Sequence, residues 1–170
     1  MAYETLEGSV VHFGPREPEK VRVAEINEPV RYLKFRVFSD GAGIKTEPFY
    51  GDSHETVIPA NSFIKSAHMY IKEAFVRTST ATGINIGLQQ ADGGGVLDAD
   101  GLFDGSDETV YANLDAANWW IEGQGSAINV VEAVSPVTED AYVRAVATGT
   151  DDFTAGDAVV VVAYIPPLSV

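Results

Sequence analysis

The chain of 170 residues contains no cysteine. Disulfide bonds, thiolate metal sites and cysteine nucleophiles are therefore excluded. The N-terminal segment MAYETLEGSVVHF lacks the basic start and apolar stretch of a secretory signal peptide. No uninterrupted apolar run approaches the ~20 residues that a membrane-spanning helix needs. From these absences we expect a soluble protein made in a cytoplasm, with no membrane partner.

Basic residues are scarce in the second half of the chain. Residues 1–80 hold ten Lys/Arg and eleven Asp/Glu, a net charge of −1, whereas residues 81–170 hold one base, Arg144, and fourteen acids, a net charge of −13. Because such a surface repels phosphates, we expect no nucleic-acid partner. The acids could serve solubility alone. The alternative is a polarity in which the acidic half faces solvent and the mixed-charge half faces a partner.

No catalytic signature is present. The three histidines, His12, His54 and His68, lie far apart in the sequence, and no Gly-x-Ser-x-Gly nucleophile elbow occurs. The glycine run at residues 93–95 lacks the Lys-Ser/Thr pair that follows in a phosphate-binding loop. The sequence therefore predicts a protein that is not an enzyme and carries no cofactor.

Asp and Gly recur between residues 91 and 108, and this segment is predicted to be a loop. Asp98, Asp100 and Asp104 carry the hard oxygen ligands that Ca²⁺ prefers, and the letters DADG begin like a calcium-binding loop. A leucine then stands in a ligand position and a phenylalanine in the position of the sharp-turn glycine, so the pattern fails. Turn chemistry is favoured, no metal is predicted, and these three aspartates are the candidate ligands if one binds.

Alternating apolar residues predict β-strands over most of the chain. Ile84, Ile86 and Leu88 alternate with polar residues, which is the period of a strand with one buried face. Residues 32–39 alternate in the same way before an Asp-Gly turn. Further short strands separated by turn residues are expected at about the spacing of a β-sandwich. They are predicted over residues 109–114, 119–122, 126–134, 142–147 and 157–165, with a loop over 46–53.

The apolar run VVVVAYI at residues 159–165 has no polar face. Such a strand exposed at a sheet edge invites aggregation, so both of its faces should be covered. We therefore expect this strand in the centre of a sheet or at a subunit interface.

Residues 61–77 fit two structures. Ile64, Ala67 and Ile71 recur at helical spacing, and periodicity alone slightly favours a helix. Several apolar residues of the same segment also share one strand parity, and strand chemistry flanks it. Together with the family resemblance given below, this leads us to predict a strand.

The adjacent Trp119 and Trp120 are the sharpest hint of binding. Neighbours on a strand point to opposite faces, so one indole would enter the core and the other would face outward. Burial of both, one in each of two packing layers, is the favoured alternative. An exposed indole near Tyr111 could stack on a sugar or anchor a protein interface.

Residues 1–30 differ from the rest of the chain. They contain three prolines, alternate acids with bases and show only short apolar pairs, as an extended arm or an edge strand would. The predicted organisation is an N-terminal arm, 1–30, followed by a domain, 31–170. Arm residues of this kind order mainly on a partner, so four bases are candidate interface residues together with the two tryptophans. These bases are Arg16, Lys20, Arg22 and Arg31.

Several segments together resemble a known family. They are IPANSFIKSAHMYIKEAF, INIGL, DADGL, the closing FTAGDAVVVVAYIP and the early VHFGPREPEK, so the resemblance runs from Val11 to Pro166. The chain resembles the small all-β virion structural proteins of tailed bacteriophages, in particular capsid decoration (cement) proteins. The matching motifs are turns and apolar positions, and no functional residue of the family transfers one by one.

The resemblance implies a role and a fold. The expected fold is an all-β, jelly-roll-like β-sandwich with an extended N-terminal arm. The expected protein is a virion subunit on the capsid exterior that binds the major capsid protein, stabilises the head and forms a homo-oligomer, a trimer. Another virion component, such as a head–tail or tail-fibre part, and a carbohydrate-binding β-sandwich module are the alternatives.

Overall fold

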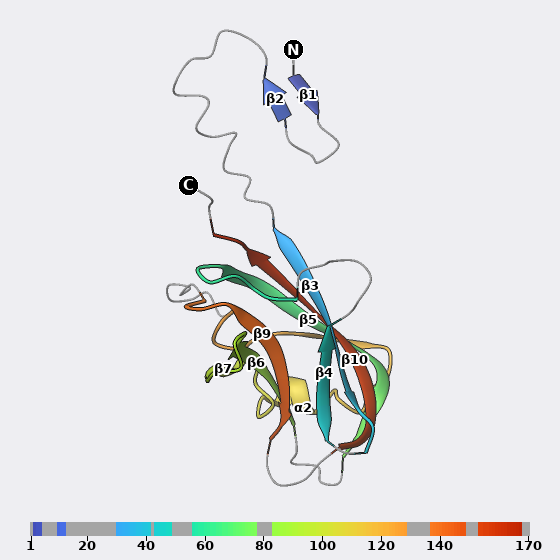
Figure 1. Cartoon of the computed structure of the whole chain (residues 1–170). Helices are drawn as coiled ribbons and strands as arrows, with labels where there is room; N and C mark the ends of the chain where they lie inside the picture. Colours follow the sequence, from blue (N-terminus) through green and yellow to red (C-terminus); the bar gives the residue numbers. More distant parts are fainter. Residues whose placement is uncertain are drawn as a thin grey trace. The chain divides into compact units, whose positions relative to one another are not determined.

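The computed structural model describes most of the chain (Figure 1). The described residues are 2–4, 10–12, 30–41, 43–48, 56–77, 83–128, 137–148 and 153–167. The chain divides into two compact units, Met1–Pro29 with Val170, and Val30–Ser169. In the first unit, β1 (Ala2–Glu4) and β2 (Val10–His12) form an antiparallel pair in which Ala2 lies opposite His12.

The second unit is built from two antiparallel sheets, so the prediction of an all-β fold is confirmed. The five-stranded sheet has the order β4–β3–β10–β5–β8, and the three-stranded sheet has the order β7–β6–β9. The larger sheet consists of β3 (Arg31–Ser39), β4 (Ile44–Pro48), β5 (Phe63–Arg77), β8 (Trp119–Glu122) and β10 (Phe153–Ile165). The smaller sheet consists of β6 (Ile84–Gln90), β7 (Val96–Phe103) and β9 (Ala141–Ala147), and one helical turn, α2 (Glu108–Tyr111), follows β7.

The hydrophobic core lies between the inner faces of the two sheets. Strand alternation places Leu33, Phe35 and Val37 of β3 on the inner face of the large sheet, and all three are buried. Ile86 of β6 and Val143 of β9 belong to the same buried cluster from the opposite side. Because one continuous core joins both sheets, the unit is a β-sandwich.

Three predictions from strand patterns are confirmed. Residues 63–77 form the long strand β5, not a helix. β10 occupies the central position of the five-stranded sheet, as its doubly apolar sequence required. The alternating strand at residues 84–90 is also present, with Ile84, Ile86 and Leu88 buried.

Four segment predictions are wrong. Residues 109–111, predicted as the start of a strand, continue α2, and 112–115 are turns. The predicted loop 91–108 contains β7, and the predicted loop 46–53 begins inside β4. Residues 126–128, predicted as strand, form turns, and 129–134 lie outside the described residues.

The segment 109–114 forms a helical turn and further turns, and not a strand, because its buried residues recur every four positions and not every two. Val110 and Leu114, four positions apart, are both buried, and the amide of Ala112 donates to the carbonyl of Glu108 at 3.0 Å. No helix in the described part of the chain is long and apolar enough to cross a membrane.

Candidate interaction face

The outer face of the five-stranded sheet carries two continuous cross-strand rows. Residues directly opposite each other on antiparallel strands point to the same side of the sheet. One row runs through Trp120, Tyr70, Val159, Arg36 and Glu47. The next runs through Glu122, His68, Val161 and Lys34. The central strand β10 therefore contributes valines to the middle of each row.

An apolar band crosses this face. It starts at Trp120 on the edge strand β8 and crosses to the valines of β10. It then continues along β10 to the end of the sheet where β3 begins, where Ala163 lies opposite Tyr32 and Ile165 lies opposite Phe63. Trp120 is 60%, Tyr32 59% and Phe63 40% exposed. We define the apolar band by its side chains, which are Tyr32, Phe63, Tyr70, Trp120, Val159, Val161, Ala163 and Ile165.

A cluster of one acid and two bases lies beside the band. The Asp157 carboxylate accepts hydrogen bonds from Arg36 Nε at 3.0 Å, Arg36 Nη2 at 3.3 Å and Lys72 Nζ at 3.2 Å. The Arg36 guanidinium also lies 4.4 Å above the ring centre of Phe38. Burial alone would raise the pKa of Asp157, but the hydrogen bonds from Arg36 and Lys72 outweigh burial and lower that pKa. Asp157 is thus paired within the subunit.

The two tryptophans are both exposed, at 52% for Trp119 and 60% for Trp120. The expectation that both are buried is therefore wrong, and so is the expectation that one enters the core. Alternation does send them to opposite faces, since Trp119 lies opposite Ile71 and Trp120 opposite Tyr70. Both stay exposed because β8 is the edge strand of its sheet. An edge strand has a neighbour on only one side to cover its side chains.

Trp120 packs on Tyr70 and is still 60% exposed to solvent. Their ring centres are 4.9 Å apart with planes inclined at 39°. The Tyr70 hydroxyl donates to the side-chain oxygen of Asn118 at 3.0 Å. Asn118 has a left-handed φ of 59° at the turn into β8, a conformation that asparagine tolerates. The result is an aromatic surface with an amide at its rim.

The candidate calcium ligands separate into two groups. Ser126 Oγ donates to Asp98 Oδ2 at 2.6 Å, and a hydrogen bond with Asp98, then burial and the Asp98 charge, raise the pKa of Asp100. Asp104 instead accepts from the amide and hydroxyl of Ser106 at 2.8 and 2.6 Å, which lowers its pKa. Within the described ranges, no three His, Cys, Asp or Glu side chains are grouped closely enough to hold a metal ion.

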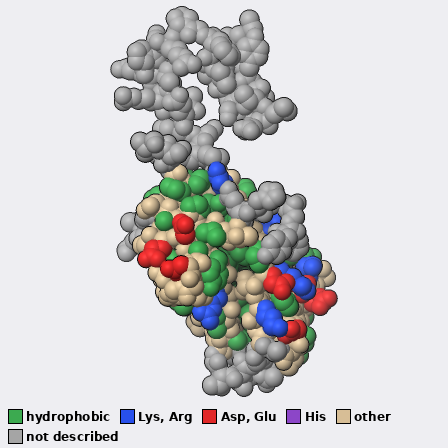
Figure 2. All heavy atoms as spheres, in the orientation of Figure 1, with side chains coloured by type: hydrophobic (Ala, Val, Ile, Leu, Met, Phe, Trp, Pro, Cys, Tyr) green, Lys and Arg blue, Asp and Glu red, His purple; other side chains and the backbone are tan. Residues whose placement is uncertain are grey.

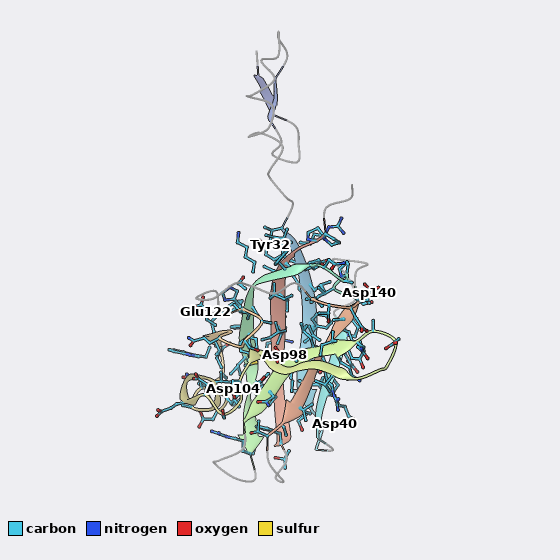
Figure 3. The ribbon with its side chains drawn as sticks, turned by 90° about the vertical axis from the view of Figure 1, so that its left-hand side faces the viewer. Tyr32, Asp40, Asp98, Asp104, Glu122 and Asp140 are labelled. Atoms are coloured by element: carbon cyan, nitrogen blue, oxygen red, sulfur yellow. The ribbon has the colours of Figure 1, made fainter. Side chains whose placement is uncertain are left out.

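Acidic side chains dominate the side of the three-stranded sheet. They are grouped at the left of Figure 2, whereas bases and acids are intermixed at the right of the figure. Figure 3 labels Asp98, which lies on β7 of the small sheet, and Asp104, which lies in the loop that follows β7. Arg144, the one base of residues 81–170, is exposed on β9. The two sheets therefore present different charge patterns to solvent.

A groove separates β4 from β9 at one side of the sandwich. Its volume is about 480 Å³, and its walls include Phe35, Ile44 and Tyr142. The backbone amide of Ala145 donates to Thr46 Oγ1 at 2.9 Å and joins the two sheets across it. The described residues of the groove walls include no pair of side chains suited to acid–base or nucleophilic chemistry.

Of the four basic interface candidates, the structure describes one. Arg16, Lys20 and Arg22 lie outside the described residues. Arg31 is the exposed first residue of β3. Its position at the start of the strand places it at the end of the sheet where Tyr32 is exposed.

The sequence matches no protein-family model. No curated protein matches it either. Among solved structures, the chain is similar to one in the capsid of Ralstonia phage GP4, with 15% identity, a TM-score of 0.50, and coverage of 85% of this chain and 89% of that chain. It is also similar to a chain of the cyanophage Pam1 capsid asymmetric unit, with 13% identity, a TM-score of 0.47, and coverage of 92% and 94%. The likeness to the GP4 chain indicates a shared fold over most of both chains.

Proposed function

We propose that this protein is a structural subunit of a tailed-bacteriophage virion, a capsid decoration protein that binds the major capsid protein on the outer surface of the head. The observation that carries the proposal is the apolar band, in which Tyr32, Phe63 and Trp120 are exposed to solvent. Contiguous exposed apolar surface marks a site of association, and the band lies on a rigid sheet. The protein acts by adhesion, adding buried area between capsid subunits, and it is not an enzyme.

The choice of a virion as the setting rests on the fold. The GP4 structure is described as a capsid, and its chain has the same fold over most of this one. The segments quoted above resemble decoration proteins independently of that comparison. A head–tail or tail-fibre part would share the same chemistry of association, so copy number in the particle separates the two.

Each surface of the chain has a part in this proposal. The N-terminal segment, with Arg16, Lys20 and Arg22, docks on acidic groups of the shell. The apolar band associates copies of the protein with one another. The acidic side of the small sheet faces solvent and keeps particles dispersed.

The test is to add the purified full-length protein to shells that lack it and to measure co-sedimentation. We expect saturable binding that weakens when salt rises from about 0.1 M to about 1 M, because the screening length then falls from about 10 Å to about 3 Å. Replacing Arg16, Lys20 and Arg22 by Glu should abolish binding. Absence of the chain from purified particles, or presence in only a few copies at one vertex, would overturn the decoration role.

A matched control separates docking from total charge. The same three charge reversals at Lys45, Lys65 and Arg144, which are exposed on three other strands, change the net charge equally. This control should bind the shell much better than the arm variant. Equal loss in both variants would show that overall charge, and not the N-terminal segment, governs docking.

A carbohydrate-binding module is the second candidate. The observation that favours it is the exposed Trp120 ring beside Tyr70 and Asn118, an arrangement that could stack on a sugar and hydrogen-bond its hydroxyls. Tyr111, expected to share this platform, lies in α2 and not on a strand. A glycan panel with the wild type and a Trp120→Ala variant tests it, and binding lost in the variant would favour this function over decoration.

A further inference from the structure

We propose that the apolar band pairs with the band of a second copy of this chain, sheet face against sheet face, about a two-fold axis parallel to β10. This inference rests on the proposed function, because it names the partner of the band. It goes further by fixing the orientation of that partner. The argument comes from the order of residues across the sheet.

The charges on either side of β10 are of opposite sign along one row. In the row Glu122–His68–Val161–Lys34, the acid lies on β8 and the base on β3, with His68 and Val161 between them. Neighbouring strands are about 5 Å apart, and packed sheets are about 10 Å apart. Both spacings are within reach of a lysine side chain paired with a glutamate.

A two-fold axis along β10 exchanges the two sides of the sheet. The β3 side of one copy then lies over the β5 and β8 side of the other, so Lys34 of each copy approaches Glu122 of its partner. Val159 and Val161 lie next to the axis and meet the same valines of the partner. A self-complementary surface of this kind is what an isologous contact requires.

Charge also favours this face over the rest of the subunit. The acids of the small sheet would repel a second copy that approached from that side. On the large sheet, Asp157 is already paired with Arg36 and Lys72, so its burial at an interface leaves no uncompensated carboxylate. The exposed rings of Tyr32 and Trp120 at the ends of the band supply the aromatic anchors typical of interfaces.

A two-fold contact fixes the parity of the assembly. On its own it produces a dimer. The three copies implied by the resemblance would need a separate three-fold contact, and the two contacts together produce six copies with D3 symmetry. An even number of copies is therefore expected in solution.

The first test is sedimentation velocity of the full-length protein across the micromolar range. We expect a dimer or hexamer in the wild type and dissociation in a Val161→Glu variant, whose charge would be buried against the same charge of the partner. Val146→Glu is the control, since Val146 is 43% exposed on β9 of the other sheet and should leave assembly unchanged. A monomeric wild type, or equal effects of both variants, would overturn the proposal.

The second test determines the orientation of the two copies. It does not require the protein to tolerate a new buried charge. Lys34→Glu alone and Glu122→Lys alone should each weaken assembly about tenfold, since each places like charges opposite one another twice per dimer. The double variant should recover most of the loss. If the loss of assembly in the double variant equals the summed losses of the two single variants, the two-fold orientation is wrong. Shell binding measured on the same variants separates the two proposals: lost assembly with intact shell binding leaves the decoration role standing.

Discussion

The two sheets of the sandwich reach close packing by different means. The large sheet fills its inner face with side chains such as Leu33, Met69 and Val160, all fully buried. In the small sheet, backbone approaches backbone at glycine: a Cβ on Gly87 would lie 2.0 Å from the carbonyl oxygen of Asp98. A packed side chain can be trimmed or repacked, but two touching backbones leave no such freedom. The small sheet is therefore expected to tolerate less change, and the large sheet to carry the adaptable outer surface.

The largest expected effect comes from Gly87→Ala. The new Cβ would overlap the backbone of β7, at 2.0 Å from the oxygen of Asp98 and 2.4 Å from the carbonyl carbon of Ala99, so β7 must move off β6. Overpacking without side-chain relief should cost about 3 kcal/mol or more of unfolding free energy. Urea unfolding followed by circular dichroism measures the loss.

Gly95→Ala, in the turn that joins the same two strands, is the control for Gly87→Ala. A Cβ at Gly95 meets only Gln90 Oε1 at 3.7 Å, an ordinary contact. This variant should be within about 0.5 kcal/mol of the wild type. If Gly87→Ala is equally mild, the backbone approach is not what holds β7, and the contrast between the two sheets fails.

A smaller effect is expected from Asp157→Asn on the large sheet. Since its partner side chains Arg36 and Lys72 are 41% and 45% exposed, water can take over part of their solvation. Losing the charged hydrogen bonds should cost about 2 kcal/mol at pH 7. Glu47→Gln, on the same outer face and exposed, is the control and should cost far less.

The free-energy cost of Asp157→Asn should decrease as the pH falls. The pKa of Asp157 is lowered in the folded state, so its contribution is complete above the usual aspartate pKa of about 3.9 and is lost as pH falls through the folded value. Wild type and Asp157→Asn should therefore differ at neutral pH and converge in acid. A difference that persists at about pH 2 would mean that packing, not charge, is responsible.

The sequence predicts a strand correctly where the order of apolar and polar residues matches which strand faces are buried. β6 alternates because one of its faces meets the core, and β10 is apolar throughout because it lies in the middle of its sheet. β7 was predicted as a loop because Asp and Gly have low strand propensity. That strand forms through a tertiary contact, the close approach to Gly87, which no local pattern records.

The candidate site shows the same limit. Alternation correctly separates Trp119 and Trp120 onto two faces, but their exposure depends on β8 being an edge strand. Strand order joins segments far apart in the sequence, so a single chain pattern does not determine it. The helical turn α2 could have been predicted from the sequence, because the apolar Val110 and Leu114 are four positions apart, which is helical spacing.

The acidic face of the small sheet predicts a stabilising substitution, Asp100→Asn. The hydrogen bond with Asp98, burial and the Asp98 charge raise the pKa of Asp100, so the protonated form adds stability in acid and that stability is lost as pH rises through the folded pKa. At pH 7 the variant should exceed the wild type by less than about 1 kcal/mol, and in acid the two should agree. Asp92→Asn, which removes one charge while its oxygen still accepts from the Gly94 amide, is the control. Equal gains in both would attribute the effect to net charge and not to the Asp98–Asp100 pair.

The smallest expected effect is that of calcium on the same pair. A ligand that binds only the native state at 100 times its Kd adds about 2.7 kcal/mol to the free energy of unfolding, which would be easily seen in a thermal melt. Among the described residues, no three acidic or histidine side chains are grouped closely enough to hold a metal ion, whereas Ca²⁺ prefers six to eight oxygens. We therefore expect the melting temperature to be unchanged by millimolar Ca²⁺ or by a chelator. A rise of several degrees in the wild type that disappears in Asp100→Asn would make Asp98 and Asp100 ligands, and the small sheet would then be a binding surface in its own right and not the solvent-facing side of the molecule.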